Sequence, residues 1–462
     1  MIVYYSIQPK MVNYSCEKCG KTFTQKGHYS RHVEKKNPCI QEKNLKKIIS
    51  SAVTEKINEF HSEKIDLIDT NTIEHHIHKM TKHDLGQYFT TNFILQEKVI
   101  DFILNDPDII LEPSIGRGDL ISCIQRKFNN VVFDMFEIDN SISLIETINS
   151  GDIVYGDFMK EYIDKTYKTI VGNPPYVKTK KGNLYIDFTE KCYHVLEENG
   201  ELIFIVPSDF FKLTSAAKLL DKMMENGTFT HIFHPHDENM FDNACIDVIV
   251  YRYCKNKHLK KTALYNNKTL YVINNDGLIT FSEIACEDKT MFKDYFDAYV
   301  GIVSGKEDVY KNNTLGNIEV LNGKNKVEKY IYITKFPCNN ESTNNHLLQH
   351  KNDLLKRGIR KFNEKNWFEW GAPRNISIME NDGGEECIYI SNLTRNKEVA
   401  FVDKVQYFGG SLIMLKPKKK CNLYNIVNYI NSEKFKQNFL FSNRFKIGHR
   451  QICNSNLPIY IL

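Results

Sequence analysis

The chain has 462 residues, of which 42% are hydrophobic and 26% charged, and its formal net charge is +4 at pH 7. No run of about 18 apolar residues is present, and the N-terminus lacks a secretory signal, so no membrane partner is expected. Twelve cysteines, most of them isolated, are typical of the reducing cell interior. We therefore expect a soluble intracellular protein, cytoplasmic or nuclear, with several domains.

The charge is unevenly distributed along the chain. Residues 1–50 hold ten Lys or Arg and three Asp or Glu, and residues 401–462 hold ten and two, so the middle is acidic. Basic ends favour a polyanionic partner such as nucleic acid. An ordinary Lys-rich surface would give the same counts, and charge alone does not decide between the two.

Residues 13–40 are predicted to form a small ββα zinc finger with a Cys-Cys-His-Cys ligand set. The spacing is two residues between Cys16 and Cys19, twelve to His32 and six to Cys39. Four sulfur and nitrogen ligands at such spacing suit tetrahedral zinc, and so small a unit needs the metal to fold. The finger is expected to bind DNA or to dock a protein. Residues 41–83, with apolar positions at helical spacing, are predicted to be a helical linker.

Residues 84–255 alternate short apolar runs with amphipathic segments, which favours a doubly wound α/β domain with a largely parallel sheet. The predicted strands are Ile109–Leu111, Val131–Phe136, Ile153–Val154, Thr169–Val171, Leu202–Val206, His231–Phe233 and Val248–Tyr251. The regular alternation then stops, and residues 263–462 are predicted to form a separate α+β domain.

The first predicted strand of this domain runs into a glycine turn that contains Gly116. Glycine lets the backbone approach a ligand closely at the carboxyl end of a strand. Glu137 ends the second strand, about 20 residues later, where an acid can accept hydrogen bonds from ribose hydroxyls. Asp157 follows the third strand and can accept from an adenine amine, while Phe158 can pack on the purine. Each feature alone is also compatible with a purely structural role.

Residues Asn173, Pro174, Pro175 and Tyr176 follow the fourth predicted strand. The Asn173 side-chain oxygen and the Pro174 carbonyl can each accept a hydrogen bond from one hydrogen of an exocyclic amine. These two hydrogen bonds draw the nitrogen lone pair out of conjugation with the ring. Tyr176 can stack on the ring, a contact worth about 1–3 kcal/mol. The pattern therefore predicts methylation of a planar amine, although an Asn-Pro β-turn would look the same.

The order of these motifs resembles the γ-class, Taq-type DNA adenine N6-methyltransferases, and residues 84–255 carry the resemblance. The family pattern is matched by Gly86–Thr90, Glu112–Gly116, Glu137–Asp139, Asp157–Phe158 and Asn173–Tyr176. The resemblance implies a Rossmann-like fold that depends on S-adenosylmethionine, double-stranded DNA as partner and a flipped adenine held by Asn173, Pro174 and Tyr176. It implies contacts of the cofactor with Thr90, Glu112, Gly116, Glu137, Ile138, Asp157 and Phe158.

One position departs from the family pattern. After the Leu202–Val206 strand the family commonly carries an aromatic residue that stacks on the second face of the base, and by position this residue is Ala216. Phe210 or Phe211 is the expected substitute. A DNA-binding protein with a degenerate methyltransferase fold therefore stays an alternative.

The nature of the methyl acceptor is narrowed by the tetrapeptide and the length of the chain. The resemblance favours adenine, since N4-cytosine enzymes usually begin the motif with Ser, and C5-cytosine enzymes need a Cys that is absent. Glutamine methyltransferases share the tetrapeptide but are shorter, and an RNA substrate stays the enzymatic alternative. We expect a monomer of the restriction–modification type without an attached endonuclease, with a C-terminal target-recognition domain. Its expected DNA contacts are Lys416, Lys418, Arg444, Lys446, His449 and Arg450.

Overall fold

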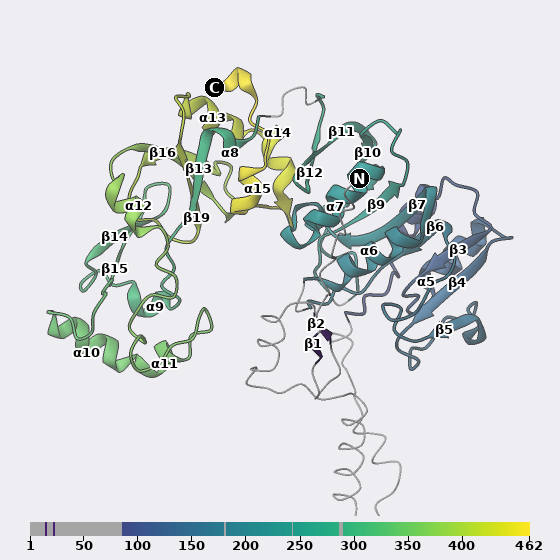
Figure 1. Cartoon of the computed structure of the whole chain (residues 1–462), viewed down its shortest axis with the longest axis horizontal. Coiled ribbons are helices and arrows are strands. Elements are labelled where there is room, and N and C mark those ends of the chain that lie inside the picture. The colour runs from purple at the N-terminus through teal and green to yellow at the C-terminus, as the bar shows by residue number, and fades with distance from the viewer. Residues whose placement is uncertain (1–13, 16–21, 24–85, 180–181, 243, 286–289) are drawn as a thin grey trace, which may run out of the picture. The chain divides into compact units, whose positions relative to one another are not determined.

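A computed structural model describes residues 14–15, 22–23, 86–179, 182–242, 244–285 and 290–462 (Figure 1). The chain divides into two compact units, Met1–Lys79 and Met80–Leu462. In the first unit, β1 (Tyr14–Ser15) pairs with β2 (Thr22–Phe23) in a short antiparallel hairpin. The rest of the predicted finger and the predicted linker lie outside the described residues. Within the described ranges, no helix combines the length and apolar character needed to cross a membrane.

The second unit contains a ten-stranded sheet of order β12-β11-β10-β8-β9-β7-β6-β3-β4-β5. Strands β3 to β7 are parallel, whereas β9 runs antiparallel between β7 and β8. The seven strands predicted from the sequence are all confirmed. The strands of this sheet are β3 (Ile109–Glu112), β4 (Val132–Glu137), β5 (Ile153–Tyr155), β6 (Tyr167–Gly172), β7 (Leu196–Pro207), β8 (Thr228–Phe233), β9 (Val248–Cys254), β10 (Thr262–Tyr265), β11 (Lys268–Asn275) and β12 (Leu278–Ser282).

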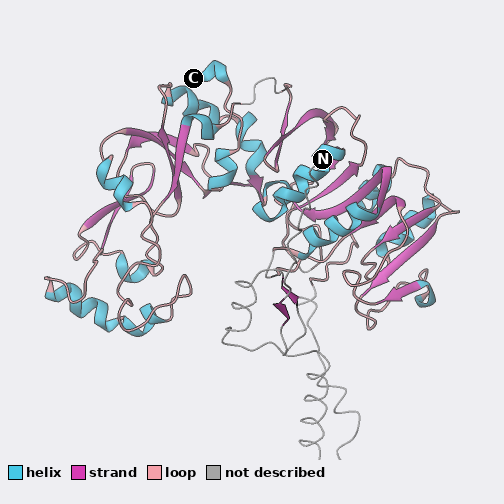
Figure 2. Ribbon diagram, viewed as in Figure 1, coloured by secondary structure: helices cyan, strands magenta, loops and turns pink. Residues whose placement is uncertain are grey.

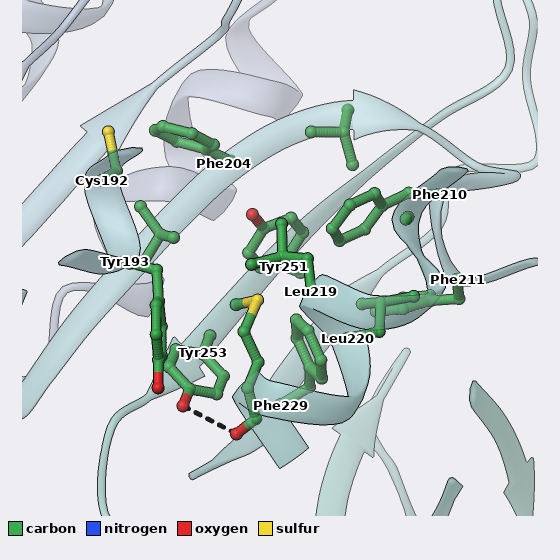
Figure 3. Packing of buried hydrophobic residues seen from close by; sticks show 14 of the residues in the cluster. Cys192, Tyr193, Phe204, Phe210, Phe211, Leu219, Leu220, Phe229, Tyr251 and Tyr253 are labelled. Carbon is green, nitrogen blue, oxygen red and sulfur yellow. Dashed lines mark hydrogen bonds between the residues drawn. The ribbon is translucent and has the colours of Figure 1, made fainter. Parts of the chain in front are cut away.

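Helices cover both faces of this sheet (Figure 2). Successive side chains of a strand point to opposite faces of the sheet. Phe204 of β7 packs on one face with α6 (Leu184–Val195) and α7 (Ala217–Asn226). Its neighbours Ile203 and Ile205 pack on the other face with α4 (Phe93–Phe102) and α5 (Asp119–Lys127). The α6 and α7 side is rich in aromatic rings (Figure 3). On that side, Tyr253 donates a hydrogen bond to the Met223 carbonyl at 2.8 Å.

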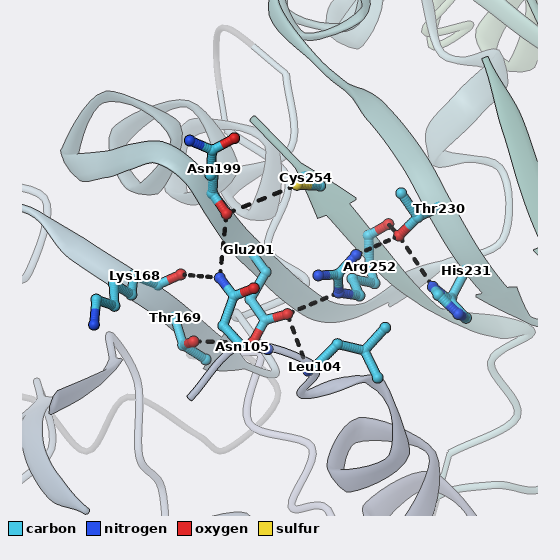
Figure 4. A network of polar contacts seen from close by, with 10 residues as sticks. All are labelled: Leu104, Asn105, Lys168, Thr169, Asn199, Glu201, Thr230, His231, Arg252 and Cys254. Atoms are coloured by element: carbon cyan, nitrogen blue, oxygen red, sulfur yellow. Dashed lines mark hydrogen bonds and ion pairs between the residues drawn. The ribbon is translucent and has the colours of Figure 1, made fainter. Parts of the chain in front are cut away.

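A buried polar network ties α4 to the middle of the sheet (Figure 4). The Glu201 carboxylate, which is fully buried, accepts from Arg252 at 2.7 Å and from Thr169 at 2.9 Å. It also accepts from the backbone amides of Leu104 and Asn105, both at 3.1 Å, just after α4. The network therefore joins β6, β7, β9 and the α4 terminus through one carboxylate.

The predicted start of the C-terminal domain at residue 263 does not coincide with the end of the ten-stranded sheet. Strand β10 pairs with β8 in parallel, and β11 and β12 continue the same sheet, so the sheet runs to Ser282. The sequence hid this continuation because Lys255–Lys261, a basic and apolar-poor segment, reads as a linker. The ten-stranded sheet therefore ends with β12, within the compact unit Met80–Leu462.

The remaining C-terminal residues form an α+β region, as predicted. A four-stranded sheet of order β13-β19-β16-β18, a β14–β15 hairpin and a β17-β21-β20 sheet form its strands. The strands are β13 (Phe296–Val300), β14 (Ile318–Gly323), β15 (Lys326–Tyr330), β16 (Glu386–Ser391), β17 (Leu393–Thr394), β18 (Ala400–Lys404), β19 (Leu412–Pro417), β20 (Leu440–Phe441) and β21 (Arg444–Lys446).

Short helices complete this region and the loops of the catalytic sheet. The α-helices are α8 (Phe292–Tyr295), α9 (Glu307–Tyr310), α10 (Glu341–Gln349), α11 (Lys351–Leu355), α12 (Ile376–Asn381), α13 (Leu423–Asn431), α14 (Glu433–Lys436) and α15 (His449–Cys453). The 3-10 helices are η1 (Ser150–Asp152), η2 (Phe210–Lys212), η3 (Thr214–Ala216), η4 (Gln437–Phe439) and η5 (Ile459–Ile461). The Ser442 amide donates to Asp247 at 2.9 Å, which anchors the β20–β21 turn on the catalytic part.

Candidate active site

The candidate site lies at the carboxyl ends of β3, β4 and β6. The chain order reverses between β3 and β6, and open α/β sheets bind ligands at such a switch point. A cavity of about 240 Å³ opens there. The predicted site residues that line it are Gly116, Glu137, Ile138, Asp157, Phe158, Asn173 and Pro175. The fold thus brings together motifs that lie up to 60 residues apart in the chain.

Glu137 holds the glycine turn in place. Its carboxylate accepts from the Gly116 amide at 2.8 Å and from the amides of Ile138 and Asp139, both at 2.9 Å. Gly116 has a φ of +58°, a left-handed conformation that favours glycine. Burial raises the pKa of Glu137, and the three amides oppose this shift. The carboxylate faces the cavity and retains acceptor capacity for ligand hydroxyls.

Glu112 is a buried carboxyl that lines a small neighbouring cavity. It is 2% exposed and accepts from the Ser114 amide at 3.1 Å, and burial raises its pKa from 4.5 to about 8. A Cβ added to Gly172 would lie 2.8 Å from a carboxylate oxygen of Glu112. Glycine at the end of β6 therefore leaves room for the Glu112 side chain. Among the residues that the structure describes, no Lys or Arg pairs with Glu112. A cationic ligand would offset the cost of burying this charge.

The Asn173 side chain has a defined orientation. Its amide nitrogen donates to the Tyr88 carbonyl at 2.6 Å and to the Thr90 hydroxyl at 3.1 Å. The Tyr88 carbonyl only accepts, so the Asn173 oxygen must point the other way, where it accepts from the Tyr176 hydroxyl at 2.6 Å. A carbonyl oxygen has two lone pairs, and one stays available for a substrate amine.

The remaining tetrapeptide residues surround that oxygen. Pro174 is buried, and within the described ranges no hydrogen bond ends on its carbonyl oxygen. The Tyr176 hydroxyl lies 3.1 Å from the Ile205 carbonyl as well as near Asn173, so its single proton has two acceptors. Of the tetrapeptide, Asn173 and Pro175 line the cavity, whereas Pro174 and Tyr176 are not among its lining residues.

Three predicted cofactor contacts have additional structural partners. Phe158 is 2% exposed and packs against Phe136 and Phe188 while it lines the cavity. Asp157 accepts from the Met159 amide at 3.1 Å and pairs with the exposed Lys160 at 2.8 Å. The hydroxyl of Thr90 is engaged by Asn173, and Thr90 lines a small neighbouring cavity together with Glu112.

The sequence reasoning missed part of the cavity wall. Gln87, Tyr88, Leu184 and Phe188 line the cavity. The signal for Tyr88 was its place inside the Gly86–Thr90 motif, of which only Thr90 was assigned a role. Leu184 and Phe188 come from the start of α6, and the signal for them was the Asn183–Phe188 segment, which fits the family pattern but was assigned no role.

The expected substitutes for the missing aromatic at Ala216 do not face the cavity. Ala216 is fully buried, and Phe210 stacks on Tyr251 with 5.5 Å between ring centres and 10° between planes. Phe211 packs edge-on against Phe229 at 4.8 Å. The expectation that Phe210 or Phe211 stacks on a ligand is therefore wrong, since both rings belong to the core.

Several predicted DNA contacts are engaged within the protein. Lys416 pairs with Asp382 at 2.6 Å and Glu385 at 3.1 Å, and Lys418 pairs with Asp297 at 3.5 Å. Lys416 thus faces two carboxylates and Lys418 one within the protein.

The other four predicted contacts, Arg444, Lys446, His449 and Arg450, lie on or next to β21 and α15. His449 contacts the Ala298 carbonyl at 2.9 Å, and Arg450 donates to the Asp276 carbonyl. Lys446 lies 3.3 Å from Asp209, two residues after β7, and the Arg444 Nε is buried with no partner among the described residues. Among these four residues, Lys446 is therefore the one that pairs with a residue just after the carboxyl end of β7.

The predicted zinc ligands Cys16, Cys19, His32 and Cys39 lie outside the described residues. Within the described residues, no group of three or more His, Cys, Asp or Glu could hold a metal ion.

The second unit thus contains a mixed α/β sheet with a cavity at its switch point, and comparison with known proteins finds methyltransferases that are similar to this part of the chain. Residues 119–241 match the family model described as Eco57I restriction-modification methylase. Type II methyltransferase M.HincII of Haemophilus influenzae is 29% identical over 226 residues, which cover 44% of this chain and 43% of that protein. Modification methylase CviBIII of Paramecium bursaria Chlorella virus NC1A is 36% identical over 161 residues, which cover 30% of this chain and 42% of that protein.

The chain is thus similar to methyltransferases of restriction–modification systems, and it spans about two fifths of the length of these curated relatives. Among solved structures, the Type IIL restriction-modification enzyme MmeI, solved in complex with DNA, matches with a TM-score of 0.51 at 10% identity. The match covers 78% of this chain and 62% of that one. It shows a shared fold that extends beyond the catalytic sheet.

Proposed function

We propose that this protein is a site-specific DNA methyltransferase that transfers a methyl group from S-adenosylmethionine to the N6 amine of an adenine flipped out of the duplex. The observation that carries the proposal is the fixed orientation of Asn173, which lines a cavity at the switch point of the sheet.

The cavity residues suit the cofactor. Glu137 offers a carboxylate to ribose hydroxyls, and Phe158 and Ile138 offer apolar surface to the purine. The buried Glu112 lacks a cationic partner among the described residues and suits the positive methionine end of the ligand. When bound, S-adenosylmethionine supplies an electrophilic methyl group on a sulfonium sulfur, which keeps the electron pair of the broken carbon–sulfur bond.

The tetrapeptide residues suit an exocyclic amine. Each of the two amine hydrogens of adenine would meet one acceptor, the Asn173 oxygen or the Pro174 carbonyl. Both contacts favour a pyramidal nitrogen with its lone pair available for attack, and they strengthen as positive charge develops there. The methylated amine then loses one hydrogen as a proton to water. Extrusion of the base costs a few kcal/mol in lost pairing and stacking.

The preference for DNA is supported by the relatives and by charge. The printed names of the relatives are those of modification methyltransferases, and MmeI was solved with DNA. Residues 401–462, which are strongly basic, suit a polyanion.

The test is single-molecule sequencing of DNA from cells that express the protein, which reports the modified base and its sequence context together. Tritiated S-adenosylmethionine should label DNA that carries this site but not matched RNA. Label on N4 of cytosine, or on RNA, would contradict the proposal. Asn173→Ala should abolish transfer and leave cofactor affinity nearly intact, whereas equal loss of both would show that the role of Asn173 is wrong.

We also propose that residues 13–40 hold one structural zinc ion through Cys16, Cys19, His32 and Cys39. The described β1–β2 hairpin brackets the Cys16–Cys19 pair, which fits the two strands of a ββα finger. Mass spectrometry of metals should find one zinc per chain. Cys39→Ser should lower that content, and a full-length protein free of zinc would refute the assignment.

A further inference from the structure

The ring of Tyr88 lies against the ring of Tyr176. Their centres are 5.4 Å apart and their planes differ by 29°, which is a stacked arrangement. Tyr88 also lines the cavity, and its carbonyl is the acceptor that orients Asn173 at 2.6 Å. One face of the tetrapeptide tyrosine is thus covered by an aromatic from the segment that precedes α4.

The other rings near Tyr176 do not offer a parallel face. Tyr185 meets it at 79° and Phe241 at 69°, so both approach edge-on. Ala216, Phe210 and Phe211 are buried in the core on the α6 and α7 side of the sheet. Among the described residues, Tyr88 is therefore the ring positioned to stack over Tyr176.

We propose that Tyr88 is the second aromatic wall of the base pocket and takes the place that Ala216 leaves open. The inference rests on the proposed function, since it assigns a residue to the flipped base. In the absence of DNA the two tyrosine rings stack on each other and keep their apolar faces from water. A base inserted between them makes two contacts of about 3.5 Å each, so the rings must separate to about 7 Å.

That separation requires a small movement of Tyr88. Its centre lies 5.4 Å from that of Tyr176, so the required displacement is about 1.5 Å, within reach of a side-chain rotation. The Tyr88 backbone stays bonded to the Asn173 amide during this movement. The Tyr88 ring and the Asn173 oxygen are therefore linked by the hydrogen bond between the Tyr88 carbonyl and the Asn173 amide. A base in the pocket contacts both residues at the same time.

The experiment compares Tyr88→Phe, Tyr88→Leu and Tyr88→Ala in the full-length protein. Tyr162→Ala is the matched control, because Tyr162 is 89% exposed. Three quantities are measured: the single-turnover rate of methyl transfer on the mapped DNA site, the fluorescence of 2-aminopurine placed at the target position, and cofactor affinity by calorimetry. Stacking quenches the fluorescence of 2-aminopurine, so the fluorescence intensity reports whether the base stacks on one aromatic ring or on two.

We expect Tyr88→Phe to act within about twofold of the wild type, because the ring remains. Tyr88→Leu and Tyr88→Ala should lower the transfer rate at subsaturating DNA by roughly 5- to 150-fold, the equivalent of one base–aromatic stack. In both variants 2-aminopurine should be brighter than in the wild type. Cofactor affinity should change by less than about threefold.

Wild-type transfer rates and fluorescence in Tyr88→Ala would overturn the inference and leave the proposed function intact. So would a loss of transfer that follows a matching loss of cofactor affinity, because Tyr88 would then belong to the cofactor site. A wild-type protein that binds cofactor but labels no DNA would instead refute the proposed function, and the inference with it.

Discussion

The Thr90 hydroxyl lies 3.1 Å from the side-chain nitrogen of Asn173, and this contact changes the role that Thr90 is given. The family resemblance implies that Thr90 contacts the cofactor. In the structure its hydroxyl accepts from the residue proposed to hold the substrate amine, and Thr90 is only 5% exposed. Thr90 is thus placed to orient Asn173.

Thr90→Val tests this positioning role because it removes the hydroxyl and keeps the shape. One neutral hydrogen bond contributes about 0.5–1.5 kcal/mol, so the transfer rate should fall roughly 2- to 12-fold. Cofactor affinity, measured by calorimetry, should not change, and Thr90→Ser should retain the wild-type rate. If Thr90→Val weakened cofactor affinity but left the rate at saturating cofactor unchanged, Thr90 would instead be a cofactor-binding residue.

The buried Glu112 predicts that stability depends on pH. Its pKa is about 8 in the folded protein and 4.5 in the unfolded chain, so between these values the folded protein holds a proton that unfolding releases. The free energy of unfolding should therefore fall as pH rises through this interval, by an amount on the order of a few kcal/mol. Denaturant unfolding at pH 5, 6, 7 and 8 measures this slope, and Glu112→Gln should flatten it. Parallel pH profiles of the two proteins would contradict the prediction.

The Glu201–Arg252 pair predicts a large loss of stability on mutation. Glu201→Leu leaves the buried Arg252 charge without its carboxylate partner and two backbone amides without an acceptor, so the free energy of unfolding should drop by about 3–5 kcal/mol. Asp101→Ala removes the exposed pair with Lys98 and should cost less than about 1 kcal/mol. Chemical denaturation measures both values. Similar losses in the two variants would show that burial does not set the cost.

The different surroundings of Lys446 and Lys416 predict different effects on DNA binding. Lys446 is 45% exposed and faces one carboxylate, that of Asp209 at 3.3 Å near the end of β7, so Lys446→Ala should reduce the magnitude of the slope of log affinity against log salt by about one. Lys416 faces two carboxylates, and Lys416→Ala should leave that slope unchanged. Titrations of the mapped DNA site at several salt concentrations provide the slopes. A slope of smaller magnitude for Lys416→Ala, with no change for Lys446→Ala, would contradict the prediction. It would show that Lys416 leaves its carboxylate partners when the protein binds DNA.

Local patterns were sufficient to predict much of the catalytic fold. Apolar runs such as Ile109–Leu111 and Val248–Tyr251 are strands in the structure, because a strand buried on both faces needs continuous apolar residues. The placement of Gly116, Glu137 and Asn173 at strand ends followed from the same runs, and all three line one cavity. Contacts between distant segments could not be predicted in this way, as β10 to β12 demonstrate by joining the sheet after a linker-like segment.

The amino-acid order by itself determined which chemical groups end the strands of the catalytic sheet, since strand and turn formation depends on neighbouring residues. Tertiary structure alone decided what those groups touch. It turned Thr90 toward Asn173, placed Tyr88 on Tyr176, buried Phe210 and Phe211 and gave Lys416 two carboxylates. The physical reason is that each of these contacts joins residues far apart in the chain, and only the packing of the folded sheet brings them within bonding distance.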